Sequence, residues 1–122
     1  MKHLSQGLHS LRTPADFAHV REKAERSWPH RLLVLYVAPN DLDRIRVGIT
    51  VSGRVGKAVV RNRVRRRLRE ALRARLPRLK PGLDLLLIAR ASSAQATWLE
   101  LSQAVDTLLS RGHATHARPV HV

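Results

Sequence analysis

Cysteine is absent from this sequence of 122 residues, and only four residues are aromatic. Without cysteine the chain forms no disulfide bond, thiolate metal site or cysteine nucleophile, a composition that fits a reducing cytosol. No apolar run is long enough for a signal peptide or a membrane-spanning helix. We therefore expect a cytoplasmic protein of one domain, residues 1–122, with an ordered core over about 10–111 and a mobile tail over 112–122.

Acidic residues are also few: there are nine, against 23 lysines and arginines, which gives a net charge of +14. So large a charge repels itself in any compact state, and the expected partner is therefore a polyanion. Nineteen of the basic residues are arginines, whose planar guanidinium groups suit bidentate phosphate contacts. This favours nucleic acid over an acidic protein. An anionic membrane is disfavoured, because the basic stretch lacks the Trp and Phe anchors of an interfacial helix.

The positive charge is concentrated between Arg61 and Arg75, where RNRVRRRLREALRAR contains eight arginines and one acid. Apolar residues recur along this stretch at helical spacing, namely Val60, Val64, Leu68, Ala71 and Leu72. The spacing predicts a helix that ends near Leu76-Pro77. Away from its apolar stripe point Asn62, Arg66, Arg69 and Arg73. Like charges four residues apart repel each other, whereas a merely solvated helix would gain by alternating signs, so we interpret the helix as a nucleic-acid-binding surface.

Groups for catalysis or metal binding are not brought together by any motif in the sequence. His113, His116 and His121 lie in the tail without a carboxylate or a fourth ligand nearby. Asp41 and Asp43 fall in a turn, where aspartate is common for structural reasons. The sequence contains no evident catalytic triad, Walker-type phosphate loop or carboxylate pair, so we expect no catalytic residue and no metal ligand in the protein.

The remaining chain predicts a mixture of helices and strands. Thr13-Pro14-Ala15-Asp16 is typical of a helix start, and we expect that helix to end near Ala24 or Arg26. Strands are expected over 32–37 and 44–51, paired as an antiparallel hairpin, and over 83–89. The capping-box spacing of Thr97 and Glu100 predicts a last helix. Its expected buried stripe is Trp98, Leu101, Val105, Leu108 and Leu109.

The scarce aromatic residues leave alternatives open. Phe17 in the first helix and Tyr36 in the first strand each either pack in the core or stack on an unpaired base. The Tyr36 hydroxyl needs a polar neighbour, which favours a position facing a ligand. Trp28, beside a proline, is not assigned. Asn62 is either a carboxamide contact to nucleic acid or a tolerated surface residue, because asparagine is a poor helix former.

The run VSGRVGKAVVRNRVRRRLRE, from Val51 to Glu70, closely resembles the signature of the bacterial ribonuclease P protein component. Asp16-Phe17, Val34-Leu35-Tyr36 and Ile88-Ala89-Arg90 fall in that family's order, so the resemblance covers about residues 10–110. It implies an α/β (α+β) two-layer sandwich of order α-β-β-β-α-β-α, with a central mixed sheet and a left-handed crossover carrying the Arg-rich helix. One strand of this order is missing from the periodicity and would lie near residues 26–31.

The resemblance also implies a function, that of an accessory protein subunit of ribonuclease P. In that enzyme a catalytic RNA holds Mg²⁺ and removes the 5′ leader of precursor tRNA, and no obligate protein partner is implied. The residues that would contact the catalytic RNA are Arg54, Lys57, Arg61, Asn62, Arg63, Arg65, Arg66 and Arg69. Those that would line a cleft for the 5′ leader are Phe17, Arg21, Tyr36, Arg44 and Arg46. Two positions depart from the family: Arg21 stands where an aromatic residue is frequent, and Gly53 where a basic one is.

Two other functions stay open at this point. A ribosomal-type RNA-binding protein would use the same basic helix but would have no leader cleft. A stand-alone nuclease would cleave RNA without a catalytic RNA. Comparing precursor with mature tRNA, and cleavage with and without the catalytic RNA, distinguishes the three.

Overall fold

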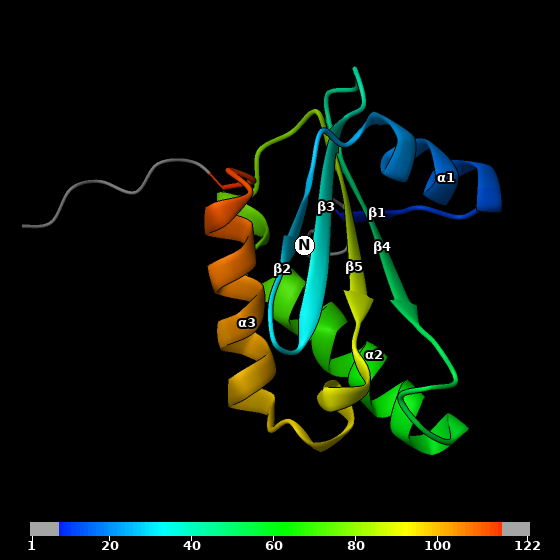
Figure 1. Ribbon diagram of the computed structural model, residues 1–122. Coiled ribbons are helices and arrows are strands. Elements are labelled where there is room, and N and C mark those ends of the chain that lie inside the picture. Colours follow the sequence, from blue (N-terminus) through cyan, green and yellow to red (C-terminus); the bar gives the residue numbers. More distant parts are fainter. Residues whose placement is uncertain (1–7, 116–122) are drawn as a thin grey trace, which may run out of the picture.

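The computed structural model describes residues 8–115, which form three α-helices and a five-stranded mixed sheet (Figure 1). In chain order the elements are β1 (Leu8–Ser10), α1 (Pro14–Lys23), β2 (Ser27–Pro29), β3 (Leu33–Pro39), β4 (Ile45–Val51), α2 (Ala58–Ala74), β5 (Leu83–Ala89) and α3 (Trp98–Arg111). Short 3₁₀ turns, η2 (Leu76–Arg78) and η3 (Ala91–Gln95), flank β5. The mixed α/β class and the strand near residues 26–31 are confirmed, and β1 is a strand that the periodicity does not indicate.

The predicted hairpin of β3 and β4 is wrong, because β5 lies between them. The sheet order is β1-β4-β5-β3-β2, with β3 antiparallel and β4 parallel to β5. Residues 85–87 of β5 point alternately to the two faces of the sheet, yet all three are completely buried. A strand in the middle of the sheet, covered on both faces, explains this burial. The short β3–β4 loop therefore spans the start of β5. There Asn40 N–H donates to the Gly82 carbonyl and Gly82 N–H donates to the Arg44 carbonyl, each at 3.0 Å.

Helices lie on both faces of the sheet. On one face α2 and α3 pack together, and Leu68 and Leu108 share a core with Leu87 of β5. On the opposite face α1 packs over part of the sheet, where Val20 lies in a smaller cluster with Leu86. In Figure 1, α2 crosses behind the strands with α3 beside it, while α1 lies on the other side of the strands from α3. Because α1 has only ten residues, part of its face of the sheet stays accessible.

Capping boxes fix where α1 and α3 begin: the one predicted at Thr97 is present, and the predicted helix start at Thr13 is a capping box as well. The Asp16 N–H donates to the Thr13 hydroxyl at 3.1 Å, and the Thr13 N–H donates back to the Asp16 carboxylate at 3.1 Å. Thr97 and Glu100 exchange the same pair of bonds at α3. The two helices thus start at the predicted residues, since each box satisfies backbone N–H groups that a helix leaves without an intrahelical partner.

The exposure of Trp98 and the path of the chain after α3 differ from the prediction. Trp98 is 40% exposed instead of buried, because it is the first residue of the helix and only the later residues of the stripe reach the sheet. At the other end the chain does not leave the fold at Gly112. Ala114 is fully buried, and its carbonyl accepts the Lys80 N–H at 2.9 Å. Residues 112–115 of the predicted tail thus pack on the fold, and its remainder lies outside the described residues.

Within residues 8–115 no helix is both long and apolar enough to cross a bilayer. In the same range no three or more His, Asp or Glu side chains gather in a group that could hold a metal ion. The ring of His113 instead lies edge-on to Trp28, with centroids 6.4 Å apart. His116 and His121 of the predicted tail lie outside the described residues.

We predict that the folded protein loses stability as the pH falls below about 5. Backbone N–H groups of Arg12 and Thr13 lower the pKa of Asp16, and Thr97 does the same for Glu100. Burial alone would raise the pKa of Asp106, but hydrogen bonds and attraction from Arg75 and Arg78 outweigh it and lower that pKa.

A carboxyl whose pKa is lowered by folding adds stability above its unfolded pKa, and this stability is lost as the pH falls through the folded pKa. The free energy of unfolding in urea, measured by circular dichroism, should therefore fall between about pH 5 and pH 2. The variant Asp106→Asn should show a shallower fall over that range. A free energy of unfolding that does not change with pH would contradict the prediction.

Candidate nucleic-acid interface

Helix α2 has the two faces that the sequence predicts. Its buried residues are Val64, Leu68, Ala71 and Leu72, and its exposed polar residues include Asn62, Arg66 and Arg69. Arg73 differs from the prediction, because it is half-buried and its Nε has no hydrogen-bond partner within the described chain. The helix ends at Ala74, and the η2 turn accommodates Pro77, so the predicted end is confirmed.

Arginines on the flanks of α2 are held by neutral oxygens. Arg63 and Arg67 donate to the carbonyls of Ala94 and Ala96, at 3.0 and 3.1 Å, which attaches the segment before α3 to α2. On the other flank Arg65 donates to the Asn62 carboxamide oxygen at 2.9 Å. Such bonds fix the side chains without neutralising them, so their positive charge stays available to an external anion. Asn62 thus has a hydrogen-bond partner within α2.

Two arginines at the carboxyl end of the basic stretch pair with a carboxylate. Arg75, the residue after α2, donates to Asp106 at 3.2 Å and to the Ser102 hydroxyl at 3.0 Å, and Arg78 donates to Asp106 at 3.1 Å. These two arginines join α2 to α3. The basic stretch that reads as uniform in sequence therefore divides into an unneutralised part, towards the start of α2, and a structural part at its end.

The loop before α2 adds to the unneutralised part. Val55 is buried and anchors the loop, while Arg54 and Lys57 are exposed. Gly56 has φ +152°, a conformation that disfavours other residues, and its carbonyl accepts from Arg61 Nε at 3.1 Å. The first turn of α2 contains no acid. The positive end of the helix dipole thus lies among basic side chains and is not offset, which favours an anion there.

Phe17 and Tyr36 lie on the α1 face of the sheet. Phe17 reaches over β4, where a Cβ on Gly48 would lie 2.9 Å from its ring. Tyr36 is paired with Leu86 of β5, and Leu86 is paired in turn with Gly48. Both aromatic side chains are only partly buried against this smaller core. The structure thus places the two predicted stacking residues on one accessible face, with β5 between them.

A pocket of about 250 Å³ connects this face with α2. Phe17 and Leu11 line one side, Arg65 and Arg69 line another, and residues 47–49 of β4 lie between them. β1 pairs with β4 only as far as Val47, so the outer edge of β4 beyond that point has no strand beside it in the described chain. An aromatic ring and two guanidinium groups therefore share one opening, a combination that suits a nucleotide.

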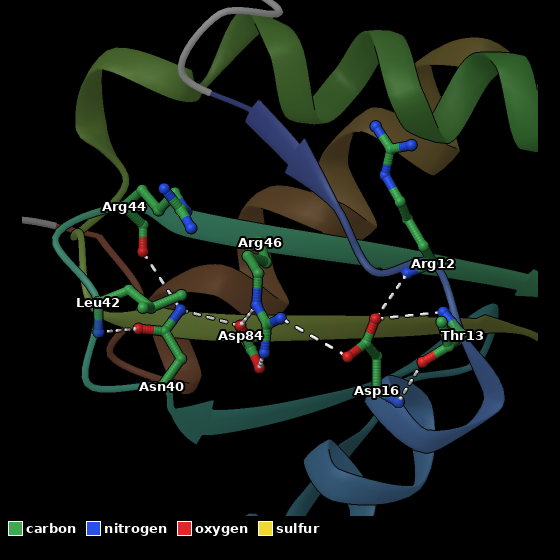
Figure 2. Close-up of polar contacts among 8 residues, drawn as sticks. All are labelled: Arg12, Thr13, Asp16, Asn40, Leu42, Arg44, Arg46 and Asp84. Atoms are coloured by element: carbon green, nitrogen blue, oxygen red, sulfur yellow. Dashed lines mark hydrogen bonds and ion pairs between the residues drawn. The ribbon is translucent and has the colours of Figure 1, made fainter.

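The guanidinium of Arg46, one of the predicted leader-cleft residues, is paired with carboxylates of the protein. It donates Nε and Nη2 to the carboxylate of the fully buried Asp84, at 2.8 and 2.6 Å, and its Nη1 lies 3.7 Å from Asp16 (Figure 2). The hydrogen bonds from Arg46 to Asp84 raise the pKa of Arg46. Of the other predicted leader-cleft arginines, Arg21 is exposed on α1 and Arg44 is exposed just before β4.

The sequence predicts neither the ion pair of Asp84 with Arg46 nor the contacts of Trp28. Asp84 is the only acid in an otherwise apolar strand, and a buried carboxylate requires a cation, so Arg46 on the neighbouring strand is its natural partner. Trp28, unassigned from sequence, packs against the larger core, and Arg26 lies 3.8 Å above its ring. Arg26 immediately precedes β2 and Trp28 lies in it; this spacing of two residues is the only hint in the sequence that the two side chains meet.

Comparisons with known proteins agree with this geometry. The Ribonuclease P family profile matches residues 6–113. The ribonuclease P protein component of Herpetosiphon aurantiacus is 45% identical over 108 residues, which are 88% of this chain and 87% of that protein. The corresponding protein of Clostridioides difficile is 42% identical over 102 residues, 83% of this chain and 89% of that one.

Solved structures show the same fold. The RNase P protein of Staphylococcus aureus superposes with a TM-score of 0.82 at 28% sequence identity, covering 88% of this chain and 98% of that one. The RNase P protein of Thermotoga maritima superposes with a TM-score of 0.76 at 26% identity, covering 84% of this chain and 96% of that one. The resemblance stated from the sequence is thereby confirmed.

We predict that Gly48→Ala moves Phe17 and destabilises the protein by about 1–3 kcal/mol. The added Cβ would lie 2.9 Å from both Leu11 Cδ1 and the Phe17 ring, so both side chains have to shift. Urea unfolding measures the loss. Gly53→Ala is the matched control, because nothing lies within 4 Å of the Cβ it would add. Equal stability of the two variants would contradict the close approach of Phe17 to β4.

Proposed function

The chain belongs to the ribonuclease P protein family, and from this premise we propose how its two surfaces share the binding of RNA. Proteins of this family are accessory subunits of the endoribonuclease that processes the 5′ ends of tRNA, and a partnership with the RNA subunit follows from membership. We propose that α2 and the loop before it bind the catalytic RNA. The α1 face of the sheet binds the single-stranded 5′ leader of precursor tRNA, in the cytoplasm.

The unneutralised charge of α2 supports the first assignment. Its flanking arginines are fixed by carbonyl and carboxamide oxygens. A phosphate backbone can therefore pair with their full positive charge without displacing an internal carboxylate. The proposed contacts to the catalytic RNA are Arg54, Lys57, Arg61, Asn62, Arg63, Arg65, Arg66 and Arg69. The proposal chiefly depends on the observation that neutral oxygens, and not carboxylates, hold the flanking arginines of α2.

The aromatic face supports the second assignment. Phe17 and Tyr36 are partly exposed on one side of the sheet, and unpaired bases stack on such rings whatever their sequence. Arg21 and Arg44 supply exposed positive charge, and Arg65 and Arg69 line the same pocket as Phe17. A duplex buries its bases, so stacking of this kind selects an unpaired leader over the folded part of tRNA.

Mg²⁺ is assigned to the RNA. Within residues 8–115 no cluster of acids fits a metal ion, and the buried carboxylate of Asp84 already accepts two bonds from Arg46. We propose that the catalytic RNA and the precursor hold the Mg²⁺ of the reaction, and that this protein contributes binding and orientation of the substrate. No protein side chain is assigned to the chemical step.

We predict that Phe17→Ala and Tyr36→Ala weaken binding of precursor tRNA by the reconstituted holoenzyme and leave binding of mature tRNA unchanged. Removing the ring on which a base stacks should cost about 1–3 kcal/mol per base. Filter binding with both tRNAs, at one salt concentration, measures the difference. Cleavage is assayed in parallel with protein alone, where none is expected, and after addition of the catalytic RNA and Mg²⁺.

Three outcomes are decisive in that experiment. Equal losses for precursor and mature tRNA would remove the leader assignment. Cleavage by the protein alone would identify a stand-alone nuclease. Failure of the wild-type protein to stimulate the catalytic RNA would favour a ribosomal-type RNA-binding protein.

We also predict that changing Arg65, Arg66 and Arg69 together to Gln weakens binding to the catalytic RNA and flattens its salt dependence. The slope of log K against log salt should become less steep by about 0.7–0.9 for each phosphate that the variant no longer neutralises. The control triple variant changes Arg26, Arg31 and Arg111, which removes the same charge away from α2. Identical slopes for the two triple variants would show that net charge, and not the α2 surface, determines binding.

A further inference from the structure

Arg46 lies at the centre of a chain of ion pairs that joins three elements of the fold. On one side its fork binds Asp84 of β5 with two hydrogen bonds, at 2.8 and 2.6 Å. The two residues are direct neighbours in the parallel pairing of β4 with β5. On the other side its Nη1 lies 3.7 Å from Asp16 of α1. Figure 2 shows the guanidinium between the two carboxylates.

Asp16 in turn determines how α1 begins. Its second oxygen accepts the N–H groups of Arg12 and Thr13, at 3.0 and 3.1 Å, while its own N–H donates to the Thr13 hydroxyl. One carboxylate thus caps the helix and attaches it to the sheet. Phe17 is the next residue, and its ring lies against Gly48 of β4, two residues after Arg46.

The charge around Arg46 is unsuited to a phosphate. One guanidinium faces two carboxylates, so these three groups carry an excess of one negative charge. Nε and Nη2 of Arg46 already donate to Asp84, and only 23% of the Arg46 side chain is exposed. A leader phosphate would have to compete with the fully buried Asp84, whose unpaired charge would be strongly destabilising.

We propose that Arg46 is a positioning residue for leader binding: through Asp16 it holds the start of α1 on the sheet and so fixes the ring of Phe17 over β4. This inference rests on the proposed leader-binding face. It differs from the sequence-based expectation, in which Arg46 contacts the leader itself. The two roles predict opposite effects when the negative charge of Asp16 is removed.

The test is binding of precursor and mature tRNA by holoenzyme reconstituted with Asp16→Asn protein. If Arg46 positions Phe17 through Asp16, the variant should bind precursor about two- to fivefold more weakly, with mature tRNA unaffected and the salt slope unchanged. If Arg46 instead contacts phosphate, Asp16→Asn removes a negative charge beside its guanidinium that competes with phosphate, while the pair with Asp84 stays. Precursor binding should then be equal or tighter, and that result would overturn the proposal.

Thr13→Ala is the matched control for capping. It removes the other half of the capping box but leaves the ion pair of Asp16 with Arg46 intact. An equal loss of precursor binding in Thr13→Ala would mean that Asp16 acts through the helix cap alone, which would also overturn the role of Arg46. A smaller loss than in Asp16→Asn supports it.

Arg46→Lys gives a second, independent readout. Lysine keeps the charge, so a phosphate contact would largely survive, but it lacks the fork that bridges two carboxylates. The positioning role predicts at least the loss seen for Asp16→Asn, and unchanged precursor binding by Arg46→Lys would exclude it.

Combining each change with Phe17→Ala separates this inference from the proposed function. If Phe17→Ala weakens precursor binding, and Asp16→Asn has no further effect in that background, Arg46 and Asp16 act through Phe17. If Phe17→Ala weakens binding but Asp16→Asn does not, only the positioning role fails. If Phe17→Ala itself has no effect on precursor binding, the leader-binding face fails, and the positioning role fails with it.

Discussion

Burial of the apolar stripe of α2 against the sheet is the interaction on which the RNA-binding surface depends. Like charges along α2 repel one another and oppose helix formation. Val64, Leu68, Ala71 and Leu72 are nearly or completely buried, and each fully buried leucine contributes about 2–3 kcal/mol. That gain exceeds a few tenths of a kcal/mol for each repelling pair. The core therefore holds in place a helix whose outer charges are not neutralised within the protein.

Arginine serves two separate purposes in this structure, and its hydrogen-bond partner tells them apart. Arg46 and Arg75 bind carboxylates and join elements of the fold: β4 to β5 and α1, and α2 to α3. Arg61, Arg63 and Arg67 bind carbonyls and keep their charge for an external partner. A net charge of +14 is thus compatible with a stable fold, because internal acids are used where the elements meet and are scarce where RNA is proposed to bind.

Local patterns in the sequence predict the helices and most strands correctly, whereas the sheet order depends on distant residues. The apolar spacing of α2, the helix start at Thr13 and the capping box at Thr97 act within a few residues, and all three predictions are confirmed. The hairpin of β3 and β4 is wrong, because a short loop favours pairing of neighbours while burial of β5 on both faces requires the middle position. β1 has three residues and no periodicity to detect.

The same distinction explains why the sequence does not reveal the ion pair of Arg46 with Asp84. Alternation along β4 correctly places Arg46 on the face opposite the larger core, but alternation does not say which residue the next strand brings beside it. Asp84 lies 38 positions later in the chain and becomes the neighbour of Arg46 only once β5 inserts beside β4. The inserted strand that separates β3 from β4 is therefore also what places Asp84 beside Arg46 and pairs the two residues. Because the chain of ion pairs through Arg46 ends at Asp16, the order of the sheet determines where the helix bearing Phe17 is held, and so connects the topology of the fold with the proposed binding of the leader.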